Sequence, residues 1–321
     1  MRRLLRTAAI ALVIFAARAP DVARAQEWPS KPVKIVVAFG AGGTADIFAR
    51  LLAPEFSTAF GQQFIVENRP GASGMPGTAH VAQSEPDGYT LLICGSGPLL
   101  TAPAMSANAG YDPLRDFTHL AMIAGDTYAL VASKSLGVKS LPDLRAPGDR
   151  NLATGSPGTG SFGHLLIEFT RRKAGVDLAH VPYRSVGDAM NDLLGGHLGL
   201  VMTPLISAAG QIRGGTVVPL GVATTERTPA FPDIPTFTQQ GLSIQGSAWF
   251  WLCGPKNLPA PIAKKLGEET RRIVTSPAIK ARFDREALIS PDMDTAALQK
   301  LVADEISLWT PLIRELGLKS Q

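Results

Sequence analysis

Two glycine-rich turns of the same kind, one in each half of the chain, constrain its fold most strongly. The first, residues 40–45, follows an apolar run at 33–39, and the second, residues 155–163, leads into a helical pattern of apolar residues. Glycine lets a backbone approach a ligand closely, and the first turn of a helix leaves unpaired N–H groups at its partly positive end. Such strand-to-helix turns can bind an anion, so the pair predicts a ligand held between two lobes.

The first 25 residues have the organisation of a secretory signal peptide. Three arginines among the first six residues precede an apolar stretch at 8–17, and Ala23 and Ala25 supply small residues where a signal peptidase cleaves. The apolar stretch is too short to span a bilayer, which takes about 20 residues. We therefore expect cleavage before Gln26 and a periplasmic mature protein.

The signal segment also carries the basic excess of the chain. The sequence has 31 basic and 27 acidic residues, and residues 1–25 hold five of the basic and one of the acidic ones, which leaves 26 of each. A formally neutral mature chain without a stripe of basic and aromatic residues argues against a nucleic-acid partner. The five histidines show no metal-ligand spacing, so no metal is expected. No cofactor is expected either.

Strand and helix patterns alternate along the rest of the chain, which predicts an α/β fold with parallel strands in two units. The elements expected for the first unit are strands at 33–39, 63–66 and 89–94 and helices at 45–60 and 78–84. Those expected for the second unit are strands at 128–132, 151–154, 178–181, 198–202 and 217–223 and helices at 162–174, 187–195 and 207–213.

The last expected elements, a strand at 248–253 and helices at 261–275 and 295–316, have no strand partners downstream. We expect them to return to the first unit and complete it. The predicted division is therefore residues 1–25 as signal peptide, 26–124 with 246–321 as the first lobe, and 125–245 as the second lobe. Two crossing segments, near residues 124–128 and 243–248, would form the hinge.

Cys94 and Cys253, the two cysteines of the chain, lie in apolar segments that are typical of strands. An exported protein can form a disulfide, yet two buried cysteines can equally stay unpaired in the core. Only their geometry decides between these alternatives.

Two enzyme hypotheses compete with a binding protein. The pattern of Gly40, Gly42 and Ala45, with Glu67 after the next strand, copies the Rossmann dinucleotide fingerprint, and residues 158–163 repeat its glycines. A nicotinamide cofactor does not suit an exported chain without a hydride-transfer constellation. An exported hydrolase would need a Gly-x-Ser-x-Gly elbow. This spacing is not met at Ser73, Ser96, Ser156, Ser161 or Ser247. The glycines could also serve tight turns alone.

Several blocks of the sequence resemble the Bug-type receptors of tripartite tricarboxylate transporters. They run from about Trp28 to Gly317 and include Trp28-Pro29-Ser30-Lys31-Pro32, Val66-Glu67-Asn68-Arg69-Pro70-Gly71-Ala72, Pro86-Asp87-Gly88-Tyr89, Tyr111-Asp112-Pro113 and His180-Val181-Pro182-Tyr183. The resemblance implies a two-lobed periplasmic binding protein of type II, with a mostly parallel sheet in each lobe. Such a receptor captures a small organic carboxylate in its cleft and delivers it to membrane permease subunits. We expect a monomer.

The resemblance also implies that the loops at 39–46 and 154–164 hold the ligand carboxylate. Hydroxyls in both loops, and the N–H groups of Gly42 and Gly43, are suitable donors. Gly43 is further expected to need backbone angles that a branched residue resists. The predicted ligand-binding residues are Phe39, Gly42, Gly43, Thr44, Asp46, Ser96, Ser156, Thr159, Gly160, Ser161, His164, Tyr183 and Thr203.

Some of these residues are expected to act indirectly. Asp46 lies in a first helical turn, where an acid stabilises the helix or its loop. His164 is expected to be neutral, because the positive end of a helix disfavours an imidazolium there. Ala45 and Thr203 stand where family members often carry a polar residue and an acid. With fewer acids in the pocket, a ligand with an amino group is disfavoured and a plain carboxylic acid is favoured.

Overall fold

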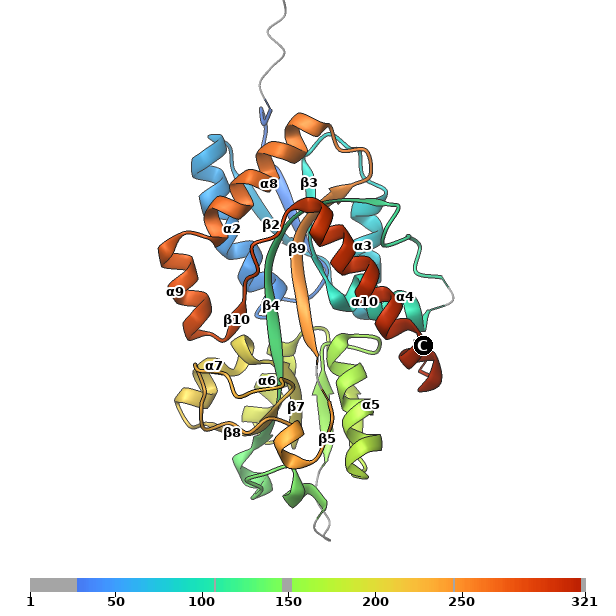
Figure 1. Cartoon of the computed structure of the whole chain (residues 1–321), viewed down its shortest axis with the longest axis vertical. Helices are drawn as coiled ribbons and strands as arrows, with labels where there is room; N and C mark the ends of the chain where they lie inside the picture. The colour runs from blue at the N-terminus through green and yellow to red at the C-terminus, as the bar shows by residue number, and fades with distance from the viewer. Residues whose placement is uncertain (1–27, 107, 146–151, 245, 319–321) are drawn as a thin grey trace, which may run out of the picture.

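The computed structural model describes residues 28–106, 108–145, 152–244 and 246–318 (Figure 1). The predicted signal peptide and its cleavage site lie outside the described residues. The described chain forms two lobes, one above the other along the long axis of the molecule, and each lobe is a sheet with helices packed around it. This confirms the predicted two-lobed α/β architecture.

The first lobe is built on the start and the end of the chain. Its strands are β1 (Val33–Val37), β2 (Phe64–Asn68), β3 (Thr90–Gly95) and β9 (Ser247–Pro255). Strand β1 pairs in parallel with β2 and β3, whereas β9 is antiparallel to β3. Its helices are α2 (Thr44–Phe60), α3 (Met75–Ala82), η2 (Gly97–Thr101), α4 (Ala102–Met105), α8 (Ala260–Val274), α9 (Pro277–Arg285) and α10 (Thr295–Glu315).

The second lobe repeats the alternation with fewer elements. Its strands are β5 (Ala153–Ser156), β6 (Ala179–Pro182), β7 (Leu200–Pro204) and β8 (Val217–Val222), and its helices are α5 (Phe162–Ala174), α6 (Val186–Leu194) and α7 (Leu205–Arg213). Strand β5 pairs in parallel with β6 and β7. Four short 3-10 turns lie in the two lobes: η1 (Ala72–Gly74), η3 (Lys134–Leu136), η4 (Pro142–Arg145) and η5 (Thr238–Gln240).

One long strand, β4 (Phe117–Ser133), runs through both lobes (Figure 1). Its first part pairs with β9 and with the short β10 (Leu288–Ile289), and from Tyr128 onward it pairs with β7 and β8, all antiparallel. The strand order β2-β1-β3-β9-β4-β7-β5-β6 is therefore continuous. The sheets are mixed rather than mostly parallel, because every pair that contains β4 or β9 is antiparallel.

The sequence predicts only the second half of β4, and α9 and β10 are missing from the prediction. Gly125 and Asp126 interrupt the apolar pattern of β4, yet both are required there by tertiary contacts. A Cβ atom on Gly125 would lie 2.6 Å from the ring of Trp249 on β9, so only glycine fits. Asp126 is fully buried and accepts a hydrogen bond from Thr44.

Cys94 and Cys253 form a disulfide between β3 and β9 inside the first lobe, with their Cα atoms 6.1 Å apart. Both residues are completely buried. The structure thus decides the alternative that the sequence leaves open, in favour of the bridge.

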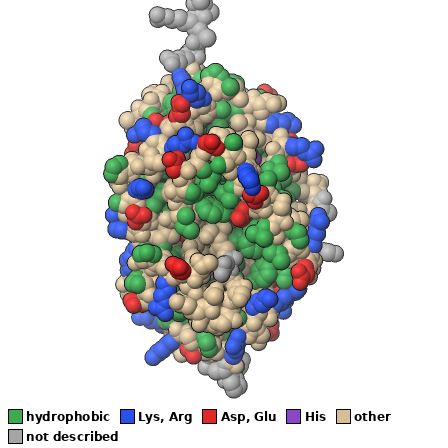
Figure 2. All heavy atoms as spheres, viewed as in Figure 1, with side chains coloured by type: hydrophobic (Ala, Val, Ile, Leu, Met, Phe, Trp, Pro, Cys, Tyr) green, Lys and Arg blue, Asp and Glu red, His purple; other side chains and the backbone are tan. Residues whose placement is uncertain are grey.

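The face shown in Figure 2 carries Lys and Arg side chains interspersed with Asp and Glu, and neither sign gathers into a broad field. Within the described ranges, no helix is both long and apolar enough to cross a bilayer.

Candidate functional site

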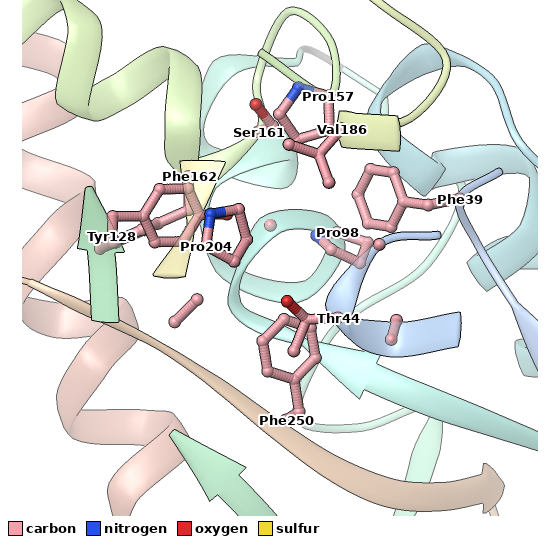
Figure 3. Close-up of a pocket in the computed structure, with 14 residues that line it drawn as sticks. Phe39, Thr44, Pro98, Tyr128, Pro157, Ser161, Phe162, Val186, Pro204 and Phe250 are labelled. Carbon is pink, nitrogen blue, oxygen red and sulfur yellow. The ribbon is translucent and has the colours of Figure 1, made fainter. Parts of the chain in front are cut away.

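A pocket lies between the two lobes at the point where several helices begin. Its empty volume is about 480 Å³, counting the part that is open to solvent. The residues that line it are Phe39, Gly43, Thr44, Ala45, Gly97, Pro98, Tyr128, Pro157, Ser161, Phe162, Val186, Pro204, Ala248 and Phe250 (Figure 3). Both lobes contribute, together with the two strands β4 and β9 that approach the pocket from below in Figure 3.

Four α-helices direct their N-termini toward this pocket. Helix α2 begins at Thr44, α5 at Phe162 and α6 at Val186, and all three residues line the pocket. Helix α7 begins just after the lining residue Pro204. Each N-terminus carries about half a positive charge and unpaired N–H groups. Since no charged side chain among the described residues lines the pocket, its attraction for an anion comes from backbone groups and hydroxyls.

The walls between these helix ends are apolar. The rings of Phe39, Phe162 and Phe250 and the prolines at 98, 157 and 204 surround the space (Figure 3). The ring of Phe162 packs edge-on against Tyr128, with centroids 5.4 Å apart, and so fixes two of the walls. The pocket therefore combines helix N-termini that suit an anion with walls that suit an apolar body.

Asp46 organises the first glycine turn. Its Oδ2 accepts hydrogen bonds from the Gly42 N–H at 3.1 Å and from Arg50 Nε at 2.9 Å, and its Oδ1 accepts one from Asn68 Nδ2 at 3.0 Å. Burial alone would raise the pKa of Asp46, but these hydrogen bonds together lower it. Asp46 thus stabilises its loop, as expected. The sequence predicts that the Gly42 N–H faces the ligand. In the structure this N–H donates to Asp46 instead.

Gly43 and Thr44 form the pocket side of this turn. Gly43 is the N-cap of α2 and has no side chain to cover the N–H groups of the first turn. Its backbone angles, φ −85° and ψ 168°, are open to any residue, so the expected need for unusual angles is wrong. That need applies to Gly42, whose φ is +86°. Thr44 donates its hydroxyl proton to Oδ2 of Asp126 over 2.7 Å.

The second glycine turn is held by its own hydrogen bonds. Ser161 lines the pocket and caps α5, because its Oγ accepts from the His164 N–H at 3.1 Å. Ser156 is fully buried, with its Oγ 2.7 Å from His180 Nε2. The Gly160 N–H donates to His164 Nδ1 at 3.1 Å, which places the ring proton of a neutral His164 on Nε2.

His164 and His180 stack on each other with ring centroids 4.0 Å apart. Burial lowers the pKa of both rings, and the neighbouring His164 lowers that of His180 further, to about 3. Both are therefore neutral at physiological pH. This agrees with the neutral His164 expected from its place at the start of α5.

The two lobes touch each other beside the pocket. The hydroxyl of Ser73 donates to the carbonyl of Thr159, and that of Thr101 donates to the carbonyl of Gly160. The Gly40 N–H donates to the carbonyl of Arg184 at 3.3 Å. The backbone carbonyls of Thr159 and Gly160 thus connect the two lobes, which are closed against each other in this structure.

Besides Gly42, Asp46, Ser156, Thr159, Gly160 and His164, three more predicted residues make no part of the pocket wall. Ser96 is fully buried and accepts the Trp249 N–H at 2.8 Å, and Thr203 is fully buried and donates to the carbonyl of Pro204 at 3.0 Å. The Tyr183 hydroxyl donates to Asp192 at 2.8 Å. Tyr183 lies in a neighbouring cleft, which shares Phe39 and Pro157 with the pocket; its other lining residues are Gly71, Ala72, Ser73, Met75, Gly158, Thr159, Pro182 and Arg184.

The pocket therefore brings together four of the predicted residues, Phe39, Gly43, Thr44 and Ser161. The sequence does not single out the aromatic walls Tyr128, Phe162 and Phe250, nor the buried acid Asp126. One available signal was the proline that follows a strand end directly before a helical pattern, as at Pro98 and Pro204, since such prolines mark helix starts. In the described part of the chain, no three His, Cys, Asp or Glu residues are grouped to hold a metal ion.

Comparison with known proteins places these features in context. Residues 48–318 match the family described as "Tripartite tricarboxylate transporter family receptor". Protein BugT of Bordetella pertussis is 31% identical over 326 residues, covering 99% of this chain and 99% of BugT. The solved structure of periplasmic binding protein BugD is 29% identical, with a TM-score of 0.87, and the match covers 92% of this chain and all of that chain.

A second solved structure shows a relative with a ligand. MatC from Rhodopseudomonas palustris with bound malate is 30% identical and has a TM-score of 0.84. The match covers 89% of this chain and 100% of that chain.

Proposed function

Because the chain belongs to the receptor family of tripartite tricarboxylate transporters, we propose that it captures a small carboxylic acid between its lobes and delivers it to a membrane permease. The family relationship and the periplasmic binding protein fold support this proposal. The observation that carries it is the convergence of four helix N-termini on a pocket without charged side chains. Such an arrangement favours a monoanionic group and offers nothing to balance a cation.

The pocket walls suggest the chemistry of the rest of the ligand. Aromatic rings and prolines surround the space, and the hydroxyls of Thr44, Ser161 and Tyr128 supply polar contacts. A compact dicarboxylate such as malate, the ligand of MatC, would have to press a second charge against apolar walls. We therefore propose a carboxylic acid with an apolar, aromatic or aliphatic body for this receptor, because burying that body is favourable by about 25 cal/mol per Å².

The proposed capture includes closure of the lobes. Strand β4 changes partners at Thr127 and Tyr128, and the return crossing enters β9 at Ser247. These positions coincide with the predicted crossing segments, and we propose that they form the hinge between residues 26–124 with 246–321 and residues 125–245. Rotation there would break the contacts of Ser73 with Thr159 and of Thr101 with Gly160 and open the pocket.

The remaining proposals follow from the family and the predicted signal peptide. We propose that the mature protein is a periplasmic monomer that needs no cofactor and catalyses no reaction. Against a dinucleotide enzyme, the N–H groups of Gly158, Gly160 and Ser161 in the second glycine turn already donate within the turn and to His164, so they are not free to bind a pyrophosphate. Against a hydrolase, the pocket-lining Ser161 uses its Oγ as a helix cap.

The identity of the bound molecule tests the proposal. The protein should be purified from its host under native conditions, then denatured, and the released small molecules identified by mass spectrometry. The expected result is one carboxylic acid with an apolar body, present at up to one equivalent. Recovery of a cationic solute or a nucleotide instead would contradict the proposed function.

A further inference from the structure

Asp126 is a buried acid at the crossing between the lobes, directly behind the pocket. Its side chain is completely buried, and its Oδ2 accepts the proton of the Thr44 hydroxyl at 2.7 Å. The carboxylate also faces the N–H groups of Leu205 and Ile206 at the start of α7. Even so, its Oδ1 has no hydrogen-bond partner among the described residues. Thr44, in contrast, lines the pocket, so it connects Asp126 to any ligand there.

The direction of the hydrogen bond between Thr44 and Asp126 decides what Thr44 offers to a ligand. A threonine hydroxyl has one proton. When Asp126 is ionised, that proton is donated to Asp126, and only oxygen lone pairs of Thr44 remain for the pocket. A ligand carboxylate, which can only accept, then finds no donor at this position. When Asp126 is protonated, Asp126 donates to Thr44 Oγ1, and the Thr44 proton is free for the ligand.

We propose that the ligand carboxylate binds the form of the receptor in which Asp126 is protonated, so that capture from neutral or alkaline solution takes up one proton. This inference rests on the proposed function. It makes Asp126 a positioning residue that controls the Thr44 hydroxyl. It also removes a conflict of charge, because an ionised Asp126 would repel a second carboxylate in a pocket that has no cationic side chain.

The surroundings of Asp126 favour its protonated form. Burial, and to a lesser extent the carboxylate of Glu286 at the end of α9, raise the pKa of Asp126, while the hydrogen bond from Thr44 and the N–H groups of α7 lower it; the net result is a pKa of about 7. Glu286 is itself paired with Arg282 at 3.2 Å.

The other groups that face Asp126 supply no counter-charge. Tyr128 follows on the same strand, and burial and the charge of Asp126 raise the pKa of its hydroxyl. On α2, the carboxylate of Asp46 is bound to Arg50. The facing residues of β9 and β10, Ala248 and Leu288, are apolar.

The affinity for a carboxylate should therefore decrease as the pH rises. A bound anion stabilises the protonated form, so affinity is highest below the pKa of Asp126 and falls by up to tenfold per pH unit above it. With a pKa of about 7, affinity should fall about tenfold between pH 6 and pH 8. His164 could give a trend of the same sign, since its protonation would attract an anion, so the experiment must separate the two.

Calorimetry with benzoate as the probe makes this separation. Titrations of the wild-type protein at pH 8, in phosphate and in Tris, give the number of protons taken up. We expect nearly one proton for the wild type. Asp126→Asn should take up none and bind benzoate about equally at pH 6 and pH 8, because its amide donates permanently to Thr44. Glu286→Gln and His164→Gln are the matched controls, and both should retain the proton uptake.

A second measurement uses the wild-type protein without ligand, so it does not depend on the choice of probe or on the folding of a variant. Carbon-13 labelled aspartate in the ligand-free wild type should show one carboxyl that titrates near neutral pH. If every aspartate titrates below about pH 5, or if benzoate binds with no proton uptake at pH 8, the inference is overturned. Failure of benzoate to bind at either pH would contradict the proposed ligand chemistry, and the carboxyl titration alone would then decide whether Asp126 holds a proton.

Discussion

Gly42 and Gly43 are neighbours in one turn, but only one of them needs to be glycine. Gly42 has φ +86°, which side chains rarely adopt, and an added Cβ would lie 3.7 Å from the Cα of Gly187 in the other lobe. Gly43 has an extended conformation, and an added Cβ would meet only Val186 at an ordinary 3.9 Å. Gly42→Ala should therefore lower the free energy of unfolding by about 1–2 kcal/mol, and Gly43→Ala by less, about 0.5 kcal/mol, because alanine is a poorer N-cap than glycine. Equal losses for both variants in thermal unfolding would contradict this assignment.

Thr44 and Ser161 both offer hydroxyls to the pocket, yet their structural roles differ. Ser161 caps α5, so Ser161→Ala should cost about 0.5–2 kcal/mol of stability in addition to weakening ligand binding. Thr44→Ala removes no cap, but it removes the hydrogen bond to the fully buried Asp126, which should cost about 1–3 kcal/mol of stability. It also removes a hydroxyl from the pocket, so binding should weaken about three- to thirtyfold. Thermal unfolding without ligand and calorimetry with ligand separate the two effects. Ligand binding by Thr44→Ala as tight as that of the wild type would contradict the role of Thr44 in the pocket.

Among the elements, the pairing of β3 with β9 carries the covalent link of the first lobe. The disulfide joins residues 159 positions apart in the sequence, and closing so long a loop restricts the unfolded chain strongly. Replacing both Cys94 and Cys253 by alanine should lower the free energy of unfolding by about 2–5 kcal/mol. Because both cysteines are buried, free thiols should appear only after unfolding in the presence of a reductant. Two reactive thiols in denaturant alone would show that the bridge is absent.

The elements also show where sequence reasoning succeeds and fails. Helix α5 has the predicted bounds, because its cap Ser161 and its terminal Gly175, with φ +64°, are local signals. The first half of β4 escapes prediction, because the reasons for Gly125 and Asp126 lie in Trp249 and Thr44, far away in sequence.

The candidate site likewise has parts that depend on local sequence and parts that depend on contacts between distant segments. Both glycine turns could be predicted, since each is a continuous stretch of chain. Its walls could not, because Tyr128 and Phe250 reach the pocket from strands whose pairing joins distant segments.

For the whole molecule, the contacts between the lobes predict an equilibrium between open and closed forms. The closed form gains the hydrogen bonds of Ser73 and Thr101 to the second glycine turn, and a ligand that touches both lobes favours it. Small-angle scattering should show a smaller radius of gyration with saturating benzoate than without ligand. The double variant Ser73→Ala with Thr101→Ala should be more open and bind more weakly. An unchanged scattering profile with bound ligand would indicate a rigid site.

The central claim is that backbone groups at helix N-termini bind a carboxylate whose body is apolar. Calorimetry on matched probes tests it most directly: benzoate, phenylacetate, cyclohexanecarboxylate and hexanoate, each beside its neutral primary amide, with malate as the compact dicarboxylate. We expect one of the monocarboxylates to bind best and its amide to bind at least about tenfold more weakly, because the charge-assisted hydrogen bonds are lost. We also expect malate to bind more weakly than the best monocarboxylate. An amide that binds as tightly as its acid, or malate as the tightest ligand, would contradict the central claim.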